Sequence, residues 1–84
     1  MHYGFRNVGT CSTRVEFDVE EGKLRNIRFA DGCNGNLKAL AALAEGMMVD
    51  EAILRLGGIT CGMKGTSCGD QLARHLQGLR KQNV

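Results

Sequence analysis

Hydrophobic and polar residues alternate through residues 13–20, and a period of two predicts a β-strand that buries one face. The apolar positions of this strand are Val15, Phe17 and Val19. After a short turn at 21–23, a second alternating stretch with Ile27 and Phe29 predicts the other strand of an antiparallel hairpin. Leu24 does not fit this alternation, which predicts a bulge or a strand start there. An earlier edge strand is favoured by the apolar residues Tyr3, Phe5 and Val8.

The spacing of apolar residues becomes helical after Gly35 and predicts three helices. Their apolar positions are Leu37, Leu40, Ala41 and Ala44, then Ile53, Leu54 and Leu56, and finally Leu72, Leu76 and Leu79. The first helix is expected to stop at Gly46, and the second to run from near Asp50 to residues 57–58. A capping-box pattern at 67–70 predicts the start of the third. These elements predict an α+β fold, in which a small antiparallel sheet is followed by three helices packed on one of its faces.

Length and composition limit both the core and the kinds of partner. A chain of 84 residues is expected to form a single domain, and a domain of this size has a thin core that a metal or disulfides often reinforce. The net charge is only +2 and basic residues are interspersed with acidic ones, so nucleic-acid binding is not expected. The start of the chain lacks a secretory leader, and charged residues interrupt the most apolar stretch, residues 37–48. We therefore expect a cytoplasmic protein without a membrane segment.

Four cysteines stand at junctions between the predicted elements rather than inside them. They are Cys11, Cys33, Cys61 and Cys68. Glycines flank each of them and permit the tight backbone that several converging sulfur atoms need. In the cytosol, a set of this kind favours metal binding or redox chemistry over structural disulfides, and four thiolates form the usual closed tetrahedral zinc site. The sequence thus predicts one four-cysteine metal site, for which zinc is the leading metal, although no C-x-x-C pair is present.

Polar residues near the cysteines are expected to support this site. Cys68 stands at a predicted helix start, where free backbone amides and the nearby Lys64 would favour its thiolate form. Asp31 and Asp70 are expected to accept hydrogen bonds around the site or to ligate directly. Ser67 and Asp70 also fit helix capping, which is the simpler role for Asp70.

The residues leave other interpretations open. The cysteines fit redox-active or disulfide-forming pairs, with Cys61 and Cys68 as the pair that closes most easily, or unconnected core thiols. His75 fits a surface position better than a ligand position, and His2 fits a loose terminus. The sequence contains no phosphate-binding loop, serine nucleophile elbow or paired carboxylates, so no catalytic site is predicted for the chain alone. A pocket for an organic cofactor between sheet and helices also stays open.

Two runs near the last cysteines, residues 57–61 and 64–73, carry a family resemblance. They resemble the TSCPD domain family, which is named for a Thr-Ser-Cys-Pro-Asp string. The string here is Thr66-Ser67-Cys68-Gly69-Asp70, with glycine in place of proline. The segment Cys33-Asn34-Gly35-Asn36 matches the Cys-x-Gly-Asn pattern of the family, so the resemblance covers nearly the whole chain.

The TSCPD family includes the C-terminal domain of adenosylcobalamin-dependent ribonucleotide reductases. The resemblance implies that zinc is bound by Cys11, Cys33, Cys61 and Cys68, that the chain is linked to ribonucleotide reduction, and that it acts through a protein partner such as a reductase. It does not imply catalysis by this chain alone, because the reductase barrel and its cobalamin site lie outside such an accessory domain.

A more distant similarity concerns the U-type iron–sulfur cluster scaffold proteins. Residues 29–35 are similar to their Phe-x-x-x-Gly-Cys-Gly segment, and Cys68 stands where they carry a cysteine at the last helix start. This resemblance implies a similar fold and, as an alternative function, an iron–sulfur cluster scaffold or carrier. A thiol–disulfide relay that serves a reductase is the other alternative. The additional Cys61 favours a closed site that holds its metal.

Overall fold

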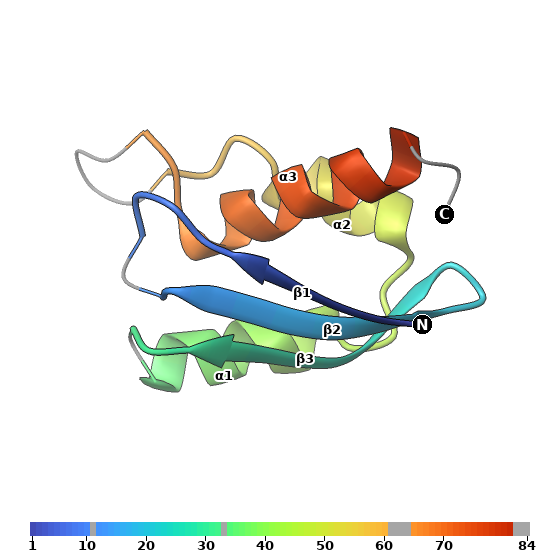
Figure 1. Cartoon of the computed structure of the whole chain (residues 1–84), viewed down its shortest axis with the longest axis horizontal. Coiled ribbons are helices and arrows are strands. Elements are labelled where there is room, and N and C mark those ends of the chain that lie inside the picture. Colours follow the sequence, from blue (N-terminus) through green and yellow to red (C-terminus); the bar gives the residue numbers. More distant parts are fainter. Residues whose placement is uncertain (11, 33, 61–64, 82–84) are drawn as a thin grey trace.

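The computed structural model of the chain describes residues 1–10, 12–32, 34–60 and 65–81 (Figure 1). Three strands precede three helices, which confirms the predicted α+β class and order of elements. The elements are β1 (His2–Arg6), β2 (Arg14–Glu20), β3 (Lys23–Ala30), α1 (Asn34–Ala44), α2 (Val49–Leu56) and α3 (Cys68–Lys81).

The strands form one antiparallel sheet in the order β1-β2-β3, so β2 is central. A two-residue turn joins β2 to β3, and its residues Glu21 and Gly22 have φ angles of 52° and 76°. Positive φ at both positions is typical of the type I′ turn, whose twist matches that of the paired strands. The short turn predicted at 21–23 is thereby confirmed.

A bulge in β3 explains why Leu24 does not fit the alternation. The pairing shifts between Glu16 and Asp18 of β2, and β3 contains one additional residue over this interval. Asn26 of β3 has a φ of 54° in this interval. Because of the extra residue, Leu24 and Ile27 both face the core, with exposed fractions of 0% and 6%.

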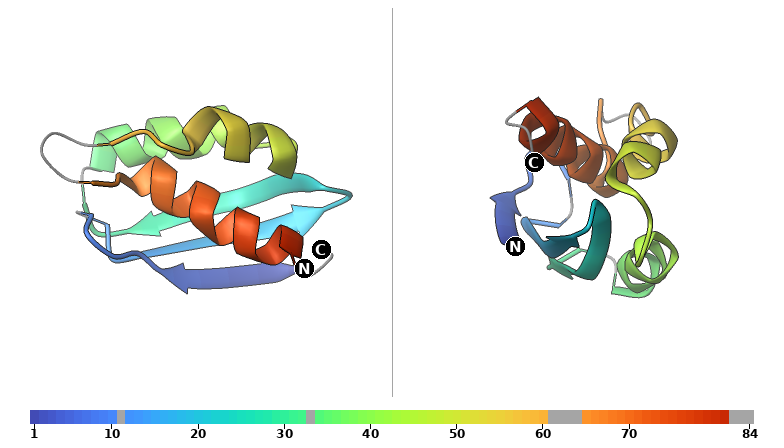
Figure 2. Two further views of the ribbon diagram at one scale, coloured as in Figure 1. Left: turned by 90° about the horizontal axis from the view of Figure 1, so that it is seen from above. Right: turned by 90° about the vertical axis from the view of Figure 1, so that its right-hand side faces the viewer.

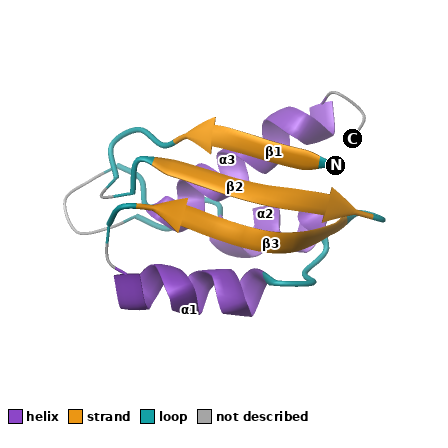
Figure 3. Cartoon of the chain, turned by 60° about the horizontal axis from the view of Figure 1, so that its bottom comes forward, coloured by secondary structure: helices purple, strands orange, loops and turns teal. Residues whose placement is uncertain are grey.

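The helices cover the apolar face of the sheet (Figure 2). Val15 and Phe17 of β2 are fully buried on this face, and the rings of Tyr3 and Phe5 of β1 lie 5.8 and 6.0 Å from the ring of Phe17. The helix α3 crosses over this face and buries Leu72, Leu76 and Leu79. The helix α1 runs alongside β3 (Figure 3) and buries Leu37 and Ala44, and α2 packs beside α3.

The predicted helix ends agree closely with the structure. After α1 the chain turns at Gly46, which has a φ of 78°, and α2 ends at the capping residue Gly57, followed by Gly58 with a φ of 85°. The edge strand is shorter than its apolar residues suggested, because β1 ends at Arg6 and the Val8 side chain is 68% exposed. Within the described ranges, no helix has the length and apolar character needed to cross a bilayer.

The two ends of the molecule differ in content (Figure 1). One end holds the described parts of the segments that join β1 to β2, β3 to α1 and α2 to α3. We call it the loop end and define it by residues 7–10, 12–13, 31–32, 58–60 and 65–68. The opposite end holds Met1, the β2–β3 turn and the last turn of α3.

Candidate functional site

Cys68 is the one predicted ligand that lies within the described residues. Cys11, Cys33 and Cys61 lie outside them, as does Lys64. Cys68 is the first residue of α3, as predicted, and its side chain is half-buried. Within the described part of the chain, no three histidine, cysteine, aspartate or glutamate residues form a group that could hold a metal ion.

Ser67 caps the helix that Cys68 begins. Its hydroxyl oxygen accepts a hydrogen bond from the backbone N–H of Asp70 at 3.1 Å and donates its proton to the carbonyl oxygen of Ile59 at 2.6 Å. The first bond satisfies one of the free amides at the helix start. The second bond ties this start to the segment that follows α2.

The sulfur of Cys68 receives a hydrogen bond from a residue that the sequence did not single out. The hydroxyl of Ser12 donates to Cys68 Sγ at 2.8 Å, and Ser12 is fully buried. Asn7 Nδ2 in turn donates to Ser12 Oγ at 2.9 Å. Asn7 Oδ1 lies 3.0 Å from His75 Nε2, so a continuous set of hydrogen bonds joins a residue of α3 to the sulfur at the start of the same helix.

His75 is therefore not a simple surface residue. Its ring is half-buried and stacks on Phe5, with ring centroids 4.6 Å apart and planes 9° apart. Burial lowers the pKa of His75 below its ordinary value, which favours a neutral ring. Since Asn7 Oδ1 can only accept a hydrogen bond, Nε2 is assigned as the nitrogen that carries the proton.

Asp70 joins the end of α2 to the start of α3. The residue is 4% exposed, and its two carboxylate oxygens accept hydrogen bonds from the hydroxyl of Thr66 and from the backbone N–H of Gly58, the latter at 2.8 Å. Arg74 Nε lies 2.9 Å from the same carboxylate. The Thr66 hydroxyl first, and then the Gly58 N–H, hold the pKa of Asp70 below its ordinary value. Asp70 thus stays ionised in a structural role and accepts hydrogen bonds two residues after Cys68.

The segment before position 33 is bonded to the segment after position 11. Asp31 is exposed and has a φ of 62°. Its Oδ2 accepts a hydrogen bond from the hydroxyl of Thr13 at 2.6 Å, and the backbone N–H of Thr13 donates to the carbonyl oxygen of Ala30 at 2.9 Å. Asp31 therefore fixes the relation between two of the loops in which cysteines occur.

The described neighbours of all four cysteines are connected at the loop end. Ser12 binds Cys68, Thr13 binds Asp31, and Ser67 binds Ile59. These three side-chain bonds join residues that are 56, 18 and 8 positions apart in the sequence. Asn7 and Ser12 could not be recognised beforehand, because a polar residue in a loop looks the same in the sequence whether it faces water or a buried sulfur.

His2 lies far from the loop end and has a different environment from the loose terminus that was expected. It belongs to β1, and its two ring nitrogens lie 2.8 Å from Asp18 Oδ1 and 3.1 Å from Glu16 Oε1 on the open face of the sheet. Hydrogen bonds that the ring donates to these carboxylates, Asp18 first, raise the pKa of His2 above its ordinary value.

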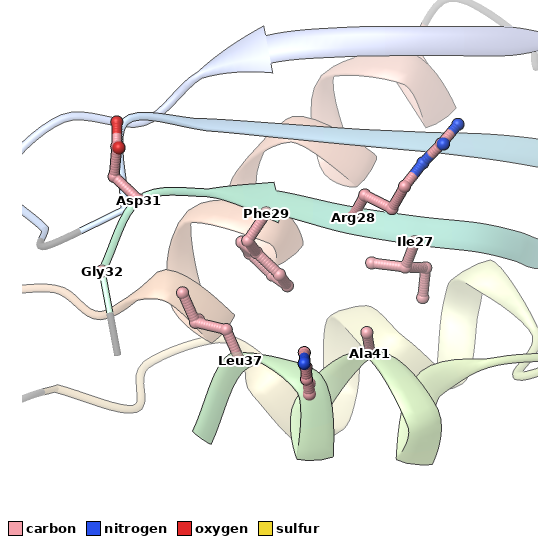
Figure 4. A pocket seen from close by; sticks show the side chains of 8 residues that line it. Ile27, Arg28, Phe29, Asp31, Gly32, Leu37 and Ala41 are labelled. Carbon is pink, nitrogen blue, oxygen red and sulfur yellow. The ribbon is translucent and has the colours of Figure 1, made fainter. Parts of the chain in front are cut away.

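A pocket of about 370 Å³ lies between β3 and α1 (Figure 4). Its apolar lining consists of Ile27, Phe29, Leu37 and Ala41, and the charged residues Arg28 of β3 and Lys38 of α1 also line it. Asp31 and Gly32 line its end near the loop end. The pocket lies between the sheet and a helix, where a small-molecule site was left open, and its lining combines apolar with charged residues.

The sequence model of the TSCPD domain family matches residues 3–79. The chain belongs to the TSCPD domain family. Membership supports a domain of the kind associated with ribonucleotide reductase. No curated protein and no solved structure matches the chain. At the position where the family string has proline, Gly69 is buried near Leu56 and Leu40, and the helix start is nevertheless capped by Ser67.

Proposed function

We propose that this chain is a zinc-binding module of the TSCPD family, with Cys11, Cys33, Cys61 and Cys68 as the zinc ligands. The observation that carries the proposal is the set of hydrogen bonds at the loop end, which connects the described neighbours of all four cysteines. Residues that follow one another in the chain are about 3.8 Å apart at Cα, so connected neighbours favour convergence of the sulfur atoms.

The donor set fits zinc. Four cysteine thiolates make a closed tetrahedral site, which holds its metal without an open position for chemistry. Cys68 contributes a sulfur at a helix start, and a hydroxyl already donates to that sulfur. When bound, zinc would crosslink four segments of a small domain and so stabilise the fold.

We propose that the module acts in the cytoplasm through a protein partner, for which a reductase is the first candidate. Family membership supports this part of the proposal. We propose no reaction catalysed by this chain alone, because a closed four-thiolate site leaves no coordination position for a substrate.

Metal analysis of the chain tests the proposal. Protein purified anaerobically without a histidine tag should contain about one zinc per chain, and each of the four Cys→Ser variants should lose it. A Thr10→Ala variant, which removes a hydroxyl from the same loop, should keep its zinc. A folded wild-type chain that contains no zinc and does not take it up would contradict the proposal.

Two other results would support an alternative function in place of zinc binding. A brown protein with thiolate-to-iron charge-transfer absorption, after anaerobic purification or reconstitution, would indicate an iron–sulfur scaffold. Reversible oxidation of Cys61 and Cys68 without loss of the fold would indicate a thiol–disulfide relay. Thiol titration under reducing and oxidising conditions measures the second outcome.

A further inference from the structure

We propose that three residues orient the sulfur of Cys68 toward the metal. They are His75, Asn7 and Ser12, which we call the donor chain. The inference rests on the proposed zinc site, and it assigns these residues a positioning role, since none of them is a proposed ligand. The donor chain begins about two helical turns beyond Cys68 in α3 and returns to its sulfur through the segment after β1.

The direction of the donor chain follows from what each group can do. Asn7 Nδ2 donates to Ser12 Oγ at 2.9 Å, so the hydroxyl proton of Ser12 is left to donate to Cys68 Sγ at 2.8 Å. If the Asn7 amide were rotated, its oxygen would accept that proton and the sulfur would lose the hydrogen bond from Ser12. His75 Nε2 at 3.0 Å from Asn7 Oδ1 holds the amide in the observed orientation.

Burial keeps the donor chain in this arrangement. Ser12 is 0% exposed and Asn7 is 7% exposed, so neither can exchange its partner for water without cost. Stacking on Phe5, with centroids 4.6 Å apart, fixes the ring of His75. The far end of the donor chain is therefore held by Phe5 of β1 and not by a residue of the loop end.

Ser67, the other serine beside Cys68, does not donate its hydroxyl proton to the sulfur. Ser67 donates its hydroxyl proton to the carbonyl oxygen of Ile59, whereas Ser12 donates to Cys68 Sγ. A hydroxyl donor to a metal-bound thiolate withdraws electron density from the sulfur and fixes the direction of its remaining lone pairs. Removal of the Ser12 hydroxyl should therefore change the strength of the bond between Cys68 Sγ and the metal.

The test uses Ser12→Ala in the full chain with zinc and with cobalt(II) as a coloured substitute for zinc. Competition against a chromophoric chelator should show zinc binding about 10–100-fold weaker than in the wild type, the usual effect of removing a group that supports a ligand. The thiolate-to-cobalt absorption should move to longer wavelength, because the sulfur donates electrons more readily. Thr10→Ala is the matched control, since its hydroxyl donates to the Ser12 carbonyl oxygen at 2.8 Å and not to the sulfur.

A folded Ser12→Ala chain with wild-type zinc affinity and an unshifted cobalt spectrum would overturn the inference. If Ser12→Ala does not fold, His75→Phe decides, because it keeps a ring on Phe5 and removes only the donor to Asn7. A shift of the cobalt band in the same direction then supports the donor chain, and an unshifted band overturns it. A wild-type chain that binds neither metal would instead refute the proposed function, and this inference with it.

Discussion

Replacing Asp70 with asparagine should lower the free energy of unfolding by about 2–3 kcal/mol. The substitution keeps the shape of the side chain and replaces one carboxylate oxygen with an NH₂ group. In the native chain the two oxygens accept from the Gly58 N–H and the Thr66 hydroxyl, and Arg74 lies beside them. An asparagine oxygen can keep one of these donors, but its NH₂ group then faces the other.

The magnitude follows from the burial of each partner. A hydrogen bond to a charged group contributes about 1.5–3 kcal/mol, and Asp70→Asn removes one such bond and weakens the second by removing the charge. The ion pair with Arg74 adds about 1 kcal/mol or less, because the guanidinium side chain is 60% exposed. For a chain of this size, the sum corresponds to a decrease in melting temperature of about 8–20 °C.

Urea unfolding followed by circular dichroism measures this loss, with zinc saturating and again with a chelator present. Glu51→Gln is the matched control, because Glu51 and Arg55 form an ion pair with the same i,i+4 spacing at 2.8 Å but with both side chains exposed. We expect this control to cost about 0.5 kcal/mol or less. The reasoning is refuted if Asp70→Asn costs no more than Glu51→Gln, or if Arg74→Ala costs as much as Asp70→Asn.

Substitutions at four further positions test other parts of the structure, each by urea unfolding. Burial lowers the pKa of His75, so stability should fall as the pH drops below the unfolded value of 6.5, and His75→Phe should abolish this fall. The pKa of His2 is raised, so its effect on stability is the reverse: His2 stabilises the fold below pH 6.5, and this stabilisation is lost as the pH rises through the higher folded pKa. In His2→Gln, this decrease in the free energy of unfolding toward alkaline pH should be absent. Gly78→Ala should stabilise the chain by about 0.5–1 kcal/mol, because Gly78 lies within α3 with no atom near the added methyl group, and a loss would contradict this account. Asn26→Ala should destabilise by about 1–2 kcal/mol because of the positive φ at the bulge, and Asn26→Gly should cost less; equal costs would show that the backbone angle is not the cause.

The fold was largely readable from the sequence because the sheet buries one face only. In such a strand every second residue is apolar, so the alternation at Val15 and Phe17 locates β2, and the misfit of Leu24 requires an extra residue in β3. The same reasoning failed at Val8. Val8 is not paired with another strand, because β1 ends at Arg6. A single apolar residue in the sequence does not indicate where a strand stops.

The candidate site was predictable only in part. Glycine-flanked junctions and a helix start gave the position of Cys68 and its cap, since both depend on local sequence. The partners of its sulfur depend on contacts between distant segments. His75 appeared to be a surface residue because Phe5 and Asn7, which cover it, lie 70 and 68 positions away in the chain.

The loop end lies opposite Met1 and the last turn of α3, and this arrangement has a practical consequence. Met1 and the last turn of α3 lie at the other end of a molecule whose long axis is 34 Å. A fusion protein, an affinity tag or a surface tether attached at either side of the described chain would therefore leave from the end remote from Cys68. Immobilised chains would all present the same end to the solution, which suits a search for binding proteins that recognise the loop end.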